Sequence, residues 1–127
     1  MVTRLSTSSP EWIAESKGVR RAIRLTAELN KLSLDDAIRV RELLSELTGH
    51  RVDETFSLIP PFYTSGGNRI RVGRKVFINQ SCTIYDMGGV NIADLVMVGP
   101  NVNIITAGHA LEPSQRRTYI EAKPIVI

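Results

Sequence analysis

A six-residue period of aliphatic residues runs through the second half of this chain and leaves few folds open to it. Two sets of three residues follow the period, with a two-residue slip at Gly88–Gly89 between them: Val72, Ile78 and Ile84, then Ile92, Val98 and Ile104. Short side chains lie four positions beyond most of these residues: Val76, Cys82, Val96 and Val102. Such a period predicts a parallel β-helix, in which six residues form a short strand and a corner, and three strands close a triangular coil. The alternative is an ordinary alternating sheet, which would have to produce both sets by chance.

Residues 9–48 carry the start and stop signals of two helices. Ser9 can cap the first helix, and it is followed by a proline, which suits the first helical position. Ser33 with Asp36 three residues later forms the pattern of a capping box for the second helix. Gly49 can end that helix in the left-handed conformation that glycine adopts readily. These signals predict a helical hairpin ahead of the repeat.

The chain therefore divides into two structural parts. Pro60 and Pro61 enforce extended backbone where the helical pattern stops. We expect an N-terminal helical cap over residues 1–58 and a β-helix over residues 59–127, which makes the fold mainly β. The β-helix would contain about two coils and the start of a third, with a loop excursion at 106–124 that interrupts the repeat. The period does not indicate the handedness of the coil.

Composition excludes several classes of protein. With 43% hydrophobic and 23% charged residues among 127, the chain is typical of a globular domain. It has no apolar run near the roughly 20 residues that span a bilayer. Its net charge of +3 comes without a zinc-finger spacing or an aromatic platform for nucleic acid. One cysteine, Cys82, fits a reducing compartment. We expect a cytoplasmic protein with no membrane and no nucleic-acid partner.

Four stretches of the sequence are similar to one known family: PPFYTSGGNRIRVG, FINQSCTIYDMGG, VGPNVNIITAGHALEPSQRR and KPIVI. With them the chain resembles the maltose/galactoside O-acetyltransferases and the nodulation-type acetyltransferases, which are hexapeptide-repeat acyltransferases. The resemblance implies a left-handed β-helix and a homotrimer with active sites between adjacent subunits. It also implies that acetyl-CoA, as co-substrate, gives its acetyl group to a hydroxyl of a sugar or another small hydroxylated acceptor.

The resemblance also assigns roles to individual residues. His109 matches the family's catalytic histidine, and imidazole suits a general base because histidine exchanges protons near neutral pH. Asn79 matches an asparagine that faces the acceptor, where an amide can donate to an oxyanion. Asp86 matches an acceptor-binding acid. The next position, which holds a second acid in some members, is Met87, and Phe77 stands where relatives have a tyrosine.

Four further residues have assignments of other kinds. Glu121, near the end of the loop excursion, is a candidate to orient His109. Arg116 and Arg117 are candidates to meet a phosphate, or simply lie in solvent. Cys82 occupies a corner position of the repeat, so we expect it in the core, because a nucleophilic thiolate needs an exposed, activating setting.

Two departures from the family pattern concern the ends of the chain. In the N-terminal stretch LSTSSPEW, serines and a threonine replace the acidic stretch with which relatives reach the acceptor just before the first helix, so we expect no such contact here. Relatives continue past the KPIVI position with more coils, which hold the pantetheine arm. Most cofactor-binding residues are therefore expected beyond Ile127, and none is assigned within this chain.

Two functions remain open on these grounds. The first is acetyl transfer to a sugar-like hydroxyl, with His109 as general base. The second is a truncated, inactive relative that acts as a trimeric scaffold or binding fragment. The β-helical carbonic anhydrases are excluded because they place three histidines on a metal ion, whereas this chain has two. We expect no metal.

Overall fold

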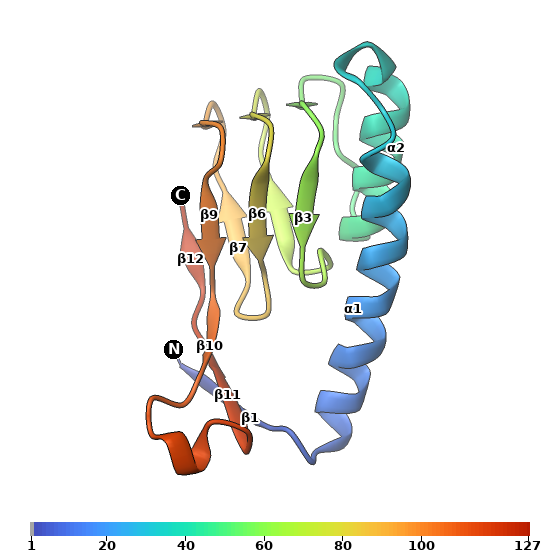
Figure 1. The fold of residues 1–127 in the computed structure, drawn as a ribbon. Coiled ribbons are helices and arrows are strands. Elements are labelled where there is room, and N and C mark those ends of the chain that lie inside the picture. Colours follow the sequence, from blue (N-terminus) through green and yellow to red (C-terminus); the bar gives the residue numbers. More distant parts are fainter. Residues whose placement is uncertain (1) are drawn as a thin grey trace.

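The structure is a computed structural model that describes residues 2–127 (Figure 1). Two helices lie together along one side of a coil of short parallel strands, and a small antiparallel sheet extends beyond the coil. Within the described range, none of the helices combines the length and apolar character that crossing a membrane requires. In chain order the elements are β1 (Thr3–Ser6), α1 (Pro10–Leu29), η1 (Leu34–Asp36), α2 (Ala37–Thr48), β2 (Ser57–Leu58), β3 (Phe62–Thr64), β4 (Ile70–Val72), β5 (Phe77–Ile78), β6 (Cys82–Tyr85), β7 (Val90–Ile92), β8 (Met97–Val98), β9 (Asn103–Ile105), β10 (Ala107–His109), η2 (Pro113–Gln115), β11 (Tyr119–Ala122) and β12 (Ile125–Val126).

Three parallel sheets form the walls of the coil, in the strand orders β2-β5-β8, β3-β6-β9 and β4-β7-β12. Successive strands of the repeat belong to different walls, as the hexapeptide period predicts, and the β3-β6-β9 wall can be followed in Figure 1. The register brings the two aliphatic sets together in pairs: Val72 with Ile92, Ile78 with Val98, and Ile84 with Ile104. The stacking predicted from the sequence is confirmed.

Corners of the coil repeat an unusual backbone conformation. Four non-glycine residues there have φ between 56° and 67°: Lys75, Ser81, Leu95 and Asn101. Each directly precedes one of the short side chains that the period places at a corner. A non-glycine residue in this region costs roughly 1–2 kcal/mol, so the packing of the walls must offset that cost at each corner. Gly89, with φ 91°, forms the corner at which the period slips, and glycine adopts this conformation without the cost.

The helix signals read from the sequence are confirmed. Ser9 Oγ accepts the hydrogen bond of the Trp12 amide at the start of α1. Ser33 and Asp36 form the capping box, although it begins the short helix η1, which leads directly into α2. Gly49 ends α2 in the left-handed conformation, with φ 74°.

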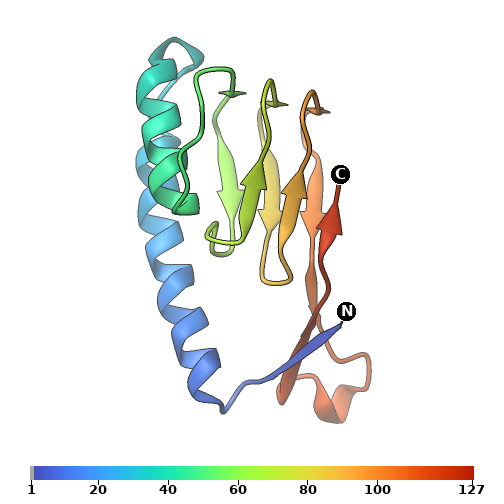
Figure 2. The ribbon, with the colours of Figure 1, turned by 180° about the vertical axis from the view of Figure 1, so that it is seen from behind.

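The apolar face of α2 packs against the first turn of the coil. Four of its apolar residues are buried: Val40, Leu43, Leu44 and Leu47. Leu47 lies so close to Gly67 that a Cβ at this glycine would come within 2.5 Å of the Leu47 Cγ. By contrast, α1 buries only Ala22, Thr26 and Leu29. Its N-terminal half extends past the coil towards the antiparallel sheet, as the view from behind shows (Figure 2).

The stacked interior gives a direct test of the coil. Replacing the fully buried Ile84 with alanine is expected to lower the free energy of unfolding by about 2–5 kcal/mol, because it opens a cavity between coils. Ile84→Val should cost only about 0.5–1.5 kcal/mol. Denaturant titration followed by circular dichroism measures both. The control is Ile38→Ala on α2, where the side chain is 70% exposed; equal losses at the two positions would contradict the stacking.

Candidate active site

Two residues, 107 and 108, connect the end of the coil at Thr106 to His109, and Thr106 is held by hydrogen bonds. Thr106, the residue after β9, is buried, and its hydroxyl donates to the Tyr85 carbonyl and accepts from the Gly88 amide. Beyond it, β10 pairs antiparallel with β11, and the register places His109 opposite Ile120. The predicted excursion at 106–124 is thus an ordered hairpin with a helical turn, η2, at its tip (Figure 1).

A backbone carbonyl orients the imidazole of His109. Its Nδ1 lies 3.1 Å from the carbonyl oxygen of Arg116. Because a carbonyl oxygen can only accept, Nδ1 carries the hydrogen, and the neutral ring keeps its lone pair on Nε2. The Arg116 guanidinium donates in turn to the carbonyls of Ala110, at 3.3 Å, and Leu111, at 2.8 Å. Arg116 therefore closes the loop around the histidine, while the residue as a whole stays exposed to solvent.

Glu121 does not orient His109, contrary to the role considered for it. In the β10-β11 register Glu121 lies opposite Gly108, whereas His109 lies opposite Ile120. Opposed residues of an antiparallel pair share a face and neighbours along a strand alternate, so the Glu121 side chain is on the other face of the sheet. There its carboxylate accepts from Arg4 at 2.6 Å.

The N-terminal strand holds the same hairpin from the outside. β1 pairs antiparallel with β11, so β11 lies between β1 and β10. Arg4 stacks on the Tyr119 ring, 4.1 Å from its centroid, and the hydrogen bond to Glu121 raises the pKa of Arg4 above its ordinary value. Thr7 adds two contacts, because its hydroxyl donates to the Arg117 carbonyl and its amide to that of Thr118. No feature of the sequence predicted this strand.

An apolar hollow of about 340 Å³ opens beside His109. Its lining comes from α1, from the β3-β6-β9 wall and its following turns, and from the β10-β11 hairpin: Trp12, Val19, Ser65, Tyr85, Met87, Ile105, Ala107, Gly108, His109 and Ile120. Of the residues singled out from the sequence, His109 and Met87 are brought together here. The other apolar lining residues were not predicted, because a valine or isoleucine has no sequence signature that distinguishes the wall of a binding site from a core.

Asn79 and Phe77 lie elsewhere in the same chain. Phe77 is in β5 and Asn79 directly follows it, on the β2-β5-β8 wall. Neither residue lines the hollow at His109. The Asn79 side-chain oxygen accepts from the Gln80 amide at 2.8 Å. Phe77 and Asn79 are both half-buried. The amide nitrogen of the side chain is the group left for an acceptor or an oxyanion.

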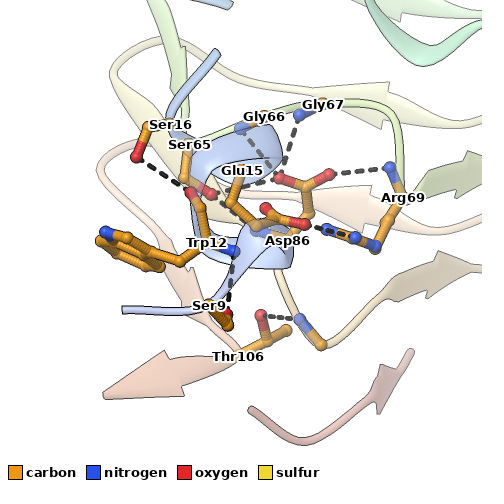
Figure 3. Close-up of polar contacts among 11 residues, drawn as sticks. Ser9, Trp12, Glu15, Ser16, Ser65, Gly66, Gly67, Arg69, Asp86 and Thr106 are labelled. Carbon is orange, nitrogen blue, oxygen red and sulfur yellow. Dashed lines mark hydrogen bonds and ion pairs between the residues drawn. The ribbon is translucent and has the colours of Figure 1, made fainter. Parts of the chain in front are cut away.

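Asp86 lies beneath the hollow as a buried structural anion (Figure 3). Only 1% of the residue is exposed. One carboxylate oxygen accepts from the amides of Gly66 and Gly67 and from two hydroxyls, and the other accepts from the Arg69 amide at 2.8 Å. Buried in this way, the carboxylate shapes the turn at 64–69 rather than facing an acceptor. The side chain that faces the hollow is that of the next residue, Met87.

An ion pair links this turn to α1. Arg69 pairs with Glu15 of the helix, and the hydrogen bond between them raises the pKa of Arg69 (Figure 3). Trp12, one turn earlier on α1, forms part of the hollow. The Glu15–Arg69 pair therefore links α1 to the turn that the Asp86 carboxylate holds, next to the hollow.

The chain is similar to several known acetyltransferases. No model of a known protein family matches it. Nodulation protein L from Rhizobium leguminosarum bv. viciae is 38% identical over 94 residues, which are 73% of this chain and 49% of that protein. Galactoside O-acetyltransferase from Lactococcus lactis subsp. lactis is 30% identical over 102 residues, 80% of this chain and 49% of that protein. The chain spans about half the length of the curated relatives it matches.

A solved structure is also similar to the chain, in both fold and sequence. The hexapeptide-repeat-containing acetyltransferase from Vibrio cholerae O1 biovar eltor, complexed with acetyl coenzyme A, matches with a TM-score of 0.76 and 34% sequence identity, over 96% of this chain and 64% of that chain. Fold, repeat and relatives all resemble those of the hexapeptide-repeat acetyltransferases. Within that class the chain is similar to nodulation protein L and galactoside O-acetyltransferase, which confirms the resemblance read from the sequence.

The structural role of the buried Asp86 carboxylate can be tested by an isosteric substitution. Asp86→Asn removes the charge and turns an NH2 group towards backbone N–H donors, so it should lower the free energy of unfolding by about 1–3 kcal/mol. The control, Asp35→Asn at an exposed position, should change it by less than about 0.5 kcal/mol. Urea titration of both variants checks this; an unchanged midpoint for Asp86→Asn would contradict the structural role.

Proposed function

We propose that this chain carries the acceptor-activating part of an acetyltransferase that moves acetyl from acetyl-CoA to a hydroxyl of a sugar or sugar-like acceptor. The contact that supports this best is the hydrogen bond from His109 Nδ1 to the Arg116 carbonyl. It selects the neutral tautomer in which Nε2 is free to accept a proton, as a general base requires. The hollow beside the ring offers room for the molecule that carries the hydroxyl.

In the proposed reaction His109 moves one proton twice. Nε2 removes the proton of the acceptor hydroxyl while that oxygen bonds to the acetyl carbonyl carbon of the thioester. The C–S bond then breaks, and Nε2 returns the proton to the departing sulfur, so that the products are the acetyl ester and free coenzyme A. The Arg116 carbonyl supports the step because it stabilises the imidazolium that forms between the two transfers.

We propose a homotrimer with a left-handed coil, as the family resemblance implies. Within one chain Asn79 and His109 belong to different parts of the fold. In a trimer, the Asn79 amide of one subunit would stabilise the oxyanion beside His109 of the next, with Phe77 near the acceptor. Several large apolar side chains exposed on the coil are available to bury between subunits: Tyr63, Tyr85, Met97 and Ile105. The use of acetyl-CoA and the reduced cysteine Cys82 favour a cytoplasmic location.

The proposal is tested by thiol release from acetyl-CoA in the presence of hydroxylated acceptors. His109→Ala should lower kcat by about 10²–10⁴-fold, the usual contribution of a general base. His50→Ala makes the same change at the other histidine, which is exposed after α2, and should leave kcat unchanged. Equal effects of the two changes would contradict the assignment.

Calorimetric titration with acetyl-CoA separates binding from chemistry. Binding that survives His109→Ala, with loss of turnover, supports the assignment of His109 as base. A chain that neither binds nor turns over acetyl-CoA would instead be a scaffold or binding fragment.

A further inference from the structure

We infer that the side chain of Arg116 is a positioning residue for His109. Its guanidinium holds the loop after the histidine closed, so that the Arg116 carbonyl keeps the imidazole in the tautomer that can accept a proton on Nε2. The inference rests on the proposed function of His109 as general base. It assigns a role to the arginine side chain in addition to that of its carbonyl.

Arg116 contacts the histidine segment in two places. Its carbonyl oxygen lies 3.1 Å from His109 Nδ1. Its guanidinium donates from Nε to the Ala110 carbonyl at 3.3 Å and from Nη2 to the Leu111 carbonyl at 2.8 Å. These carbonyls belong to the two residues that directly follow His109. One residue therefore holds both the imidazole and the backbone that carries it, which restrains the ring relative to its own backbone.

Other contacts hold the Arg116 carbonyl weakly. The β10-β11 pairing stops at His109. The helical turn η2 (Pro113–Gln115) is short, and the Arg116 amide donates to the Pro113 carbonyl at 3.4 Å, which is long for a hydrogen bond. From the N-terminal side, Thr7 donates only to the carbonyls of the two residues after Arg116. Without its guanidinium contacts, residue 116 would be free to turn its carbonyl away from the ring.

The chemistry of the ring depends on this carbonyl. A neutral imidazole carries one hydrogen, and the nitrogen that bonds to a carbonyl must be the one that carries it. An unrestrained histidine favours the hydrogen on Nε2, which would leave that nitrogen unable to take the proton of an acceptor. The contact of His109 Nδ1 with the Arg116 carbonyl reverses this preference. A guanidinium suits the loop better than an ammonium, because its planar fork directs two N–H groups at two adjacent carbonyls.

The neighbouring arginine provides a matched control for the tautomer. Arg117 lies in the same exposed loop. Its backbone carbonyl accepts from the Thr7 hydroxyl at 2.7 Å, whereas its guanidinium forms no hydrogen bond with any other described residue. Loss of the Arg117 side chain therefore removes one positive charge from the loop and leaves the contacts of Arg116 in place.

The kinetic test measures thiol release from acetyl-CoA by the full chain, with methyl β-D-galactoside as acceptor. Arg116→Met keeps the length of the side chain without its donors and should lower kcat by about 10–100-fold, because the base loses its orientation. Arg116→Lys should recover part of that loss. Arg39→Met, the same exchange on the exposed surface of α2, should leave kcat unchanged. Thermal unfolding followed by circular dichroism checks that the coil stays intact in each variant.

Calorimetric titration with acetyl-CoA separates positioning from cofactor binding. The Kd of Arg116→Met for acetyl-CoA should match that of the unsubstituted chain. A weaker Kd with unchanged kcat would mean that Arg116 meets a phosphate of the cofactor, which overturns the inference. An unchanged kcat and Kd, in a chain that His109→Ala inactivates, would also overturn the inference and leave the proposed function intact.

Nitrogen-15 NMR of the two histidine rings gives a measurement that needs no turnover. In alkaline buffer, where imidazoles are neutral, His109 should carry its hydrogen on Nδ1, and exposed His50 serves as the unrestrained reference. Arg116→Met should move the His109 signals towards those of His50, and Arg117→Met should not. That shift in a chain that transfers no acetyl would support the positioning role while the proposed function fails. Unchanged His109 signals in Arg116→Met would overturn the inference, whatever happens to kcat.

Discussion

Parallel stacking of aliphatic side chains between successive coils controls the position of everything outside the coil. Ile84 packs on Ile104 in the same wall, and a shift of one residue in either strand would turn the whole interior row outwards. The register therefore cannot slide. Because it cannot slide, Asp86 and Thr106, each the first residue after its strand, occupy equivalent positions in adjacent layers.

These two positions explain why the site lies at this end of the β3-β6-β9 wall. The Asp86 carboxylate accepts hydrogen bonds from backbone amides of the turn at 64–69, and the Thr106 hydroxyl bridges the Tyr85 carbonyl and the Gly88 amide. The layers are thus tied together by polar contacts where the aliphatic stack ends. The hairpin that carries His109 starts where these hydrogen bonds connect the layers, so the coil holds its first residues in place.

The sequence predicted the parts of the molecule that depend on side-chain pattern. The stacked interior residues, such as Ile84, were placed correctly because the period of a repeat determines which residues pair between coils. The helix ends at Ser9, Ser33 and Gly49 were placed correctly because few residue types serve as helix caps. His109 came from the family resemblance. The expected contact of Glu121 with His109 was wrong, because side-chain identity does not indicate which face of a hairpin a residue occupies. The true partner, the Arg116 carbonyl, is a backbone group that every residue possesses.

Asp86 is a second residue whose side-chain direction could not be predicted from the sequence. A carboxylate in a family motif suggests a ligand, yet the structure buries it under backbone amides, and the residue that meets the hollow is its neighbour Met87. Motif matching located the right corner of the coil but not the direction of each side chain. That direction depends on the turn at 64–69, which long-range hydrogen bonds fold.

The pairing of β1 with β11 also has a consequence for biosynthesis. Arg4 and Glu121 are separated by 117 residues, so the N-terminal strand leaves the ribosome long before its partner exists. The helices and the first coil consist of local and near-local contacts, which can form during translation. The hairpin that carries His109 gains its outer strand only when residues 119–122 have been made. Nascent chains would thus acquire the scaffold early and the fully braced active-site loop last.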